Sequence, residues 1–168
     1  MRRLLLVLVP ALAVTAAVTA SAGAGTQRTS LGGRLSVVLP HGWHVVRGRV
    51  SEVVDPVPRA LATFHVRFAR HACECGMPNL ANLPRDGAFV FTWEYTRISR
   101  RDLQYFPEHA ARFAIGPGAP RVSSCQMSES RNFREAGRGF QVQIYLGPDA
   151  PASVRHQLAA ILDSWRLS

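Results

Sequence analysis

Residues 139–167 read GFQVQIYLGPDAPASVRHQLAAILDSWRL, and this stretch decides the predicted fold. Within 139–146 apolar residues alternate with polar ones, the period of a strand that buries one face. The large apolar residues that follow fall at helical spacing, and they are Val154, Leu158, Ile161, Leu162 and Trp165. Asp149 is expected to cap this helix, and Pro151 suits its first turn. The stretch therefore predicts a strand followed by a helix that lies across a sheet.

Further strands are predicted upstream of this stretch. SRNFRE and GFQVQIYL flank the sequence AGRG, the arrangement of a β-hairpin. The region from Asp102 to Gly118 contains prolines and glycines that limit any helix to a few turns around PEHAARFA. Apolar or alternating runs predict the remaining strands, which lie at 34–39, 43–49, 60–68 and 88–95. The prediction is an α+β fold with a mainly antiparallel β-sheet packed by a C-terminal α-helix.

The N-terminus has the pattern of a secretory signal peptide. Two arginines precede an apolar run from Leu4 to Val18, and small residues follow it. We predict a signal peptide over 1–24 and a single α+β domain over 25–168, working outside the cytoplasm as a secreted or cell-envelope protein. The alternative is that the leader is retained as a membrane anchor, which would be the only membrane contact.

The chain has 20 arginines and no lysine, against 11 acidic residues. Arginine binds phosphate and sulfate groups well, so a polyanionic partner is one interpretation. The arginines are scattered, however, and only RISRRD at 97–102 is a local cluster. A GC-rich coding sequence explains this pattern, and no specific nucleic-acid partner is predicted.

Two segments carry a resemblance to a known family. VVLPHGWHV at 37–45 and the terminal AAILDSWRL at 159–167, together with the late hairpin, resemble exported bacterial domains similar to the photosystem II extrinsic subunit superfamily (PsbP-like). The resemblance covers the two ends of the mature chain. It implies an α+β domain that binds or scaffolds, and it transfers no active-site residue.

The three cysteines are Cys73, Cys75 and Cys125. In an oxidising compartment they predict a disulfide from Cys73 or Cys75 to Cys125, and the sequence leaves the choice open. Closing a loop of this size stabilises a fold by about 4 kcal/mol in the chain-entropy model. The third cysteine is then free, buried or intermolecular, whereas a bond between Cys73 and Cys75 would close a strained, redox-active ring.

A metal site is the sharper alternative. His71, Cys73 and Cys75 alternate along the chain, so an extended segment would project them to one side, and Cys125 could complete a tetrahedral zinc site. Met77 and Met127 add thioether sulfur that suits cuprous copper. The spacing is shorter than in usual zinc knuckles, so no metal or other cofactor is the primary prediction.

No catalytic motif emerges from the rest of the chain. Sequences of the G-x-S-x-G, P-loop and H-E-x-x-H types are absent. Trp43, Trp93 and Trp165 are expected in the core rather than in a ligand platform. The sequence favours an exported noncatalytic domain that binds a protein partner or a small ligand. The alternative is an envelope protein that uses its cysteines for metal or thiol redox chemistry.

Overall fold

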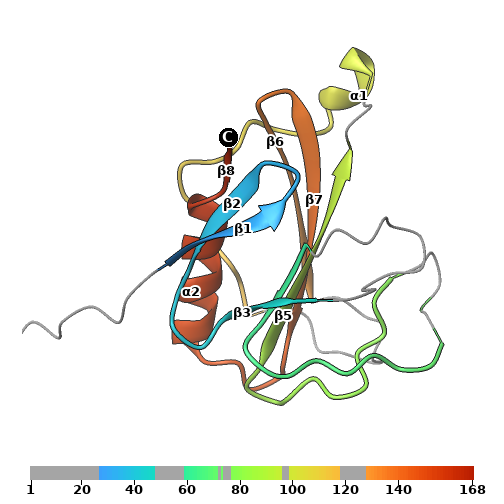
Figure 1. Ribbon diagram of the computed structural model, residues 1–168, viewed down its shortest axis with the longest axis vertical. Helices are drawn as coiled ribbons and strands as arrows, with labels where there is room; N and C mark the ends of the chain where they lie inside the picture. Colours follow the sequence, from blue (N-terminus) through green and yellow to red (C-terminus); the bar gives the residue numbers. More distant parts are fainter. Residues whose placement is uncertain (1–26, 48–58, 72, 74–76, 96–98, 118–127) are drawn as a thin grey trace, which may run out of the picture.

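The fold is known from a computed structural model, which describes residues 27–47, 59–71, 73, 77–95, 99–117 and 128–168. Two antiparallel sheets and a C-terminal helix dominate it (Figure 1), which confirms the predicted α+β class. The larger sheet has the order β3(His44–Val46), β4(Ala60–Ala62), β5(Ala88–Tyr95), β7(Arg138–Leu146), β6(Glu129–Glu135). The smaller sheet has the order β1(Gln27–Gly32), β2(Leu35–Leu39), β8(Arg166–Leu167). The helices are α1(Arg100–Leu103) and α2(Ala152–Asp163).

The main core lies between the larger sheet on one side and α2 with the smaller sheet on the other (Figure 1). Leu158, Ile161 and Leu162 on α2 are fully buried there, and Trp165 follows just after the helix. The Trp165 ring meets Phe133 and Phe140 edge-on, with ring centroids 5.6 and 5.5 Å apart. Burial of Leu158, Ile161 and Leu162 contributes about 1.5–3 kcal/mol each to the stability of the fold. The helical stripe predicted from the sequence is thus confirmed as core.

The hairpin between β6 and β7 is also confirmed. Glu135 pairs with Arg138, so Ala136 and Gly137 are the two turn residues. Both have positive φ, 48° and 75°. This is the backbone of a type I′ turn, whose twist matches that of the flanking strands.

The start of α2 differs from its prediction. Pro151 is the N-cap residue rather than a first-turn residue, and it provides no side-chain hydrogen bond. The carboxylate of Asp149 turns away from the helix and pairs with Arg85, with Nε and Oδ2 2.6 Å apart. Asp149 is therefore held by an ion pair and does not cap the helix.

The strand predicted over 60–68 is wrong in length, because only Ala60–Ala62 is a strand. Thr63 ends the pairing: its N–H donates to Ala88 O (3.0 Å), and its hydroxyl accepts from Ala88 N (2.9 Å). The chain then turns, and Phe64, Val66 and Phe68 pack against the second face of the larger sheet. The alternating pattern did identify Phe64, Val66 and Phe68 as partly buried side chains of this segment.

Other predicted elements also differ from the observed ones. The strand predicted over 43–49 is observed as His44–Val46, and positions 48 and 49 lie outside the described residues. Segment 107–114 is not helical, and the nearby helix is the single turn α1. The strands β1 and β8 were not predicted; β8 is only two residues long and follows the helix directly. Within the described residues, no helix has the length and apolarity needed to cross a membrane.

Candidate functional site

The second face of the larger sheet, opposite α2, is covered by residues 63–71, 73 and 77–83, which we call the cysteine loop. Its two arms run antiparallel and meet at Phe68 and Leu80. Ala69 N donates to Asn79 O (2.8 Å), and Ala81 N donates to Arg67 O (2.9 Å). Its apolar side chains join Phe89, Phe91 and Tyr145 of the sheet in a second apolar cluster. The loop is therefore a built layer of the fold.

Two asparagine side chains hold the arms together. The Oδ1 of Asn82 accepts from Arg67 N (2.7 Å), while its Nδ2 donates to His65 O (2.8 Å). The Nδ2 of Asn79 donates to His71 O (2.9 Å). Each amide side chain bonds backbone groups that have no partner in a regular strand-to-strand pattern. The loop consequently depends on specific polar contacts as well as on apolar burial.

Cys73 lies at the outer end of this loop and is buried, with 7% of its surface exposed. Its N–H donates to Met77 O (3.2 Å), and its sulfur lies 3.5 Å from Pro78 O. Cys75 and Cys125 lie outside the described residues, so the disulfide and the choice of its partners stay predictions.

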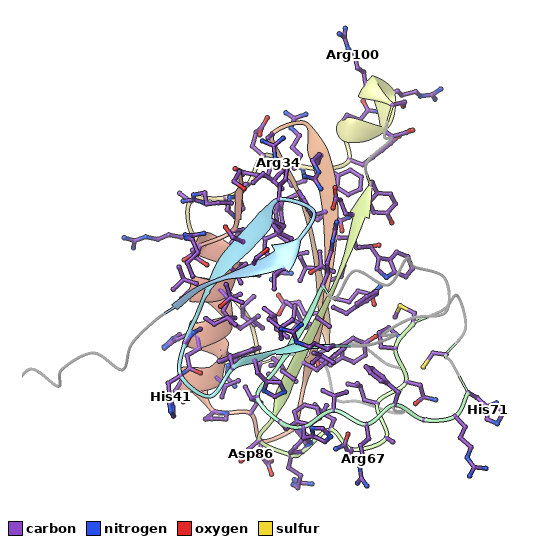
Figure 2. The ribbon with its side chains drawn as sticks, viewed as in Figure 1. Arg34, His41, Arg67, His71, Asp86 and Arg100 are labelled. Carbon is purple, nitrogen blue, oxygen red and sulfur yellow. The ribbon has the colours of Figure 1, made fainter. Side chains whose placement is uncertain are left out.

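The metal alternative shares one described cysteine with the disulfide. His71 is exposed, and Figure 2 shows it at the outer end of the loop with its ring pointing away from the sheet. Cys73, two residues later, is buried. The described parts of the chain contain no group of three or more histidine, cysteine or acidic side chains placed to hold a metal ion. Cys75, Cys125 and Met127 fall outside those parts.

Beyond the cysteine loop, the same face of the sheet becomes polar. Trp93 of β5 is paired in register with Gln141 of β7, which is paired with Asn132 of β6. We call these three residues the amide row. Asn132 is exposed, and the other two are half-buried. The row thus places two amide side chains beside an indole on one face of the sheet.

Aromatic rings extend the amide row. The hydroxyl of Tyr95 donates to Gln141 Oε1 (3.1 Å), and its ring lies 5.3 Å from that of Phe106. Phe91 meets Trp93 edge-on at 5.9 Å, which links the row to the cluster beneath the cysteine loop. The indole N–H of Trp93 is buried and finds no acceptor among the described residues. A buried donor of this kind costs about 1–3 kcal/mol and calls for an explanation.

The most buried carboxylate with charged partners lies on the opposite face. The side chain of Glu94 is 2% exposed and contacts the guanidinium groups of Arg59 and Arg138. Arg138 Nη1 also donates to Gly33 O (3.1 Å) in the β1–β2 turn. Burial, and secondarily the charge of Arg138, lower the pKa of Arg59. This cluster ties the smaller sheet to the larger one, which is a structural role.

Sequence reasoning missed the amide row, although it contained part of the signal. The alternation of 139–146 correctly put its two glutamines on the face away from the main core. Nothing local indicated that Asn132 of the neighbouring strand would stand in line with Gln141 and Trp93. Trp43 and Trp165 are buried as expected, while Trp93 is only half-buried.

Comparisons with known proteins add no relative: no family model, curated protein or solved structure matches this chain. The resemblance to PsbP-like domains therefore stays a prediction that rests on the two end segments and the hairpin.

Proposed function

We propose that the protein is an exported, noncatalytic binding domain and that its ligand, an uncharged saccharide, lies on the amide row. The observation that supports this most directly is the register of Trp93, Gln141 and Asn132 across three adjacent strands. An aromatic ring offers a flat apolar surface to the C–H face of a sugar ring. The amides offer donors and acceptors to its hydroxyl groups.

The surroundings of the row support a rigid site. All three residues lie on paired strands, and sites on such elements are held more precisely than sites on loops. The Tyr95 hydroxyl fixes one acceptor of Gln141, which leaves its NH₂ group for a ligand.

The cysteine loop serves this function as a support. It covers the neighbouring part of the same face, and Phe91 connects it to Trp93. A disulfide from Cys73 to Cys125 would hold the loop in place in the oxidising exterior. The cysteines are therefore assigned to stability, and no cofactor is part of the proposal.

Binding of the soluble trimer of N-acetylglucosamine tests the proposal by calorimetry. We expect saturable binding, weakened about three- to tenfold by Gln141→Ala or by Asn132→Ala, because each removes a neutral hydrogen bond worth about 0.5–1.5 kcal/mol. Gln104→Ala is the matched control, since Gln104 is an exposed amide beside α1. No binding, or equal binding by all three variants, would contradict the proposal.

A further inference from the structure

One buried histidine connects three elements that are distant in the sequence. The side chain of His109 is 8% exposed. Its Nε2 lies 2.8 Å from Leu162 O in the last turn of α2, and its Nδ1 lies 3.2 Å from Glu135 Oε2 at the end of β6. Its ring is packed against Phe133 and Phe113, with centroids 4.9 and 5.4 Å away.

The two partners of the ring restrict its protonation. A backbone carbonyl and a carboxylate oxygen are both acceptors, so each ring nitrogen must carry a proton to bond its partner. A neutral imidazole has a proton on one nitrogen only. The Leu162 carbonyl also lies at the negative end of the α2 dipole, which favours a cation. The geometry thus matches the imidazolium form of His109.

His109 belongs to a segment, 107–113, that also contacts β6 and α2 through backbone hydrogen bonds and an ion pair. His109 N donates to Arg134 O (3.0 Å), and Arg134 N donates to Pro107 O (2.7 Å). Phe113 N donates to Oδ1 of Asp163 (2.7 Å), the last residue of α2. The ring of His109 is the side chain of this segment that bonds both β6 and α2, through Glu135 and Leu162 O.

We infer that His109 is a proton-dependent latch that holds segment 107–113 against α2 and β6 when its ring is doubly protonated. Loss of one proton leaves either Leu162 O or the Glu135 carboxylate facing a lone pair, and the segment then opens more often. Histidine is the side chain whose charge changes between about pH 5 and about pH 8, so acidification closes the latch.

The charged groups around the latch do not supply the same pH response. Glu135 is the carboxylate that faces the ring. Asp163, from the end of α2, is engaged by Phe113 N, and Glu108, from the segment itself, is paired with Arg134 of β6 at 2.7 Å. Arg112 is exposed beside Phe113. Carboxylates and guanidinium groups ordinarily keep their charge between about pH 6 and about pH 8, whereas a histidine side chain ordinarily does not.

Hydrogen exchange of the exported protein tests the latch, with rates corrected for the intrinsic effect of pH. At about pH 8, opening of peptides within 105–117 should be about tenfold more frequent than at about pH 5.5, the scale expected for one charge-assisted contact. His109→Gln should open frequently at both pH values. His156→Gln, which changes an exposed histidine on α2, should behave as the unmodified protein does.

A nitrogen NMR spectrum of the unmodified protein keeps the inference testable if His109→Gln fails to fold. At about pH 5.5 both ring nitrogens of His109 should carry protons that exchange slowly with water. A neutral ring at that pH, equal opening at both pH values, or a preserved pH response in His109→Gln would overturn the inference. These readouts do not involve the saccharide, so they are independent of the proposed ligand.

Discussion

The two faces of the larger sheet are covered in different ways. On one face, α2 and the smaller sheet bury a continuous apolar stripe against β5, β6 and β7. On the other, the cysteine loop is held by asparagine side chains and backbone bonds. The first cover is stabilised mainly by area removed from water, the second by a few specific contacts. Changes on the helical side should therefore act globally, and those on the loop side locally.

The largest effect is expected at Trp165, which is 1% exposed between the helix and the sheet. Trp165→Ala removes a large side chain from a closed core and should lower the free energy of unfolding by about 3–5 kcal/mol. Urea denaturation measures this loss. His156→Ala, on the exposed side of α2, is the comparator and should change the unfolding midpoint little. A small effect of Trp165→Ala would mean that α2 is a dispensable cover.

The disulfide should give the next largest effect. Cys73→Ser should lower the free energy of unfolding by about 2–5 kcal/mol under oxidising conditions. Cys125→Ser should match it if Cys125 is the partner, and Cys75→Ser should then be nearly neutral. With reductant present, the variants and the unmodified protein should unfold alike. If Cys75→Ser causes the loss and Cys125→Ser is neutral, the bond is the short ring between Cys73 and Cys75.

A smaller, local effect is expected at Asn82. Asn82→Ala leaves Arg67 N and His65 O without their partners. Because both groups can be reached by water once the loop opens, the cost should be about 1–2 kcal/mol. Hydrogen exchange should accelerate in peptides of the cysteine loop and stay unchanged in peptides of α2. Acceleration in both would show that the two covers unfold as one unit.

The same contrast explains how far the sequence predicted the fold. The α2 stripe and the β5 and β7 strands follow from side-chain periodicity, which is local and strong. The segment after Ala62 kept its alternation, with Phe64, Val66 and Phe68 partly buried, yet it left the sheet. The reason is a contact 25 residues away: Thr63 bonds both backbone groups of Ala88. A contact between residues this far apart in the chain cannot be predicted from the local sequence pattern.

The candidate sites divide in a similar way. The sequence predicted a disulfide among Cys73, Cys75 and Cys125 from residue type and compartment, because disulfides persist in oxidising surroundings. It could not bring Gln141, Asn132 and Trp93 together, since their alignment depends on strand register. His109 was equally invisible, because its partners Glu135 and Leu162 come from elements that meet only in the folded chain. The sequence thus shows which residue types are present, but it does not show which distant elements come into contact in the fold.

The smallest effect is expected where the two covers meet, at the exposed ion pair between Arg85 and Asp149. The hydrogen bond to Asp149, and then the charge of that carboxylate, raise the pKa of Arg85 above its usual value. A raised pKa means that the contribution is complete below the usual value and is lost only as pH rises through the folded-state pKa, far above neutrality. The pair therefore adds no pH dependence between about pH 6 and about pH 9.

Arg85→Gln should leave the urea midpoint unchanged, because water competes fully for an exposed pair. Backbone bonds keep this junction closed without it: Asp149 N donates to Arg85 O (2.7 Å), and Gly147 N donates to Gly87 O (2.8 Å). Gly147→Ala provides the contrast, since its new methyl group would lie 2.2 Å from the carbonyl oxygens of Pro84 and Arg85. If Arg85→Gln were as destabilising as Gly147→Ala, side-chain charge rather than backbone fit would join the two covers.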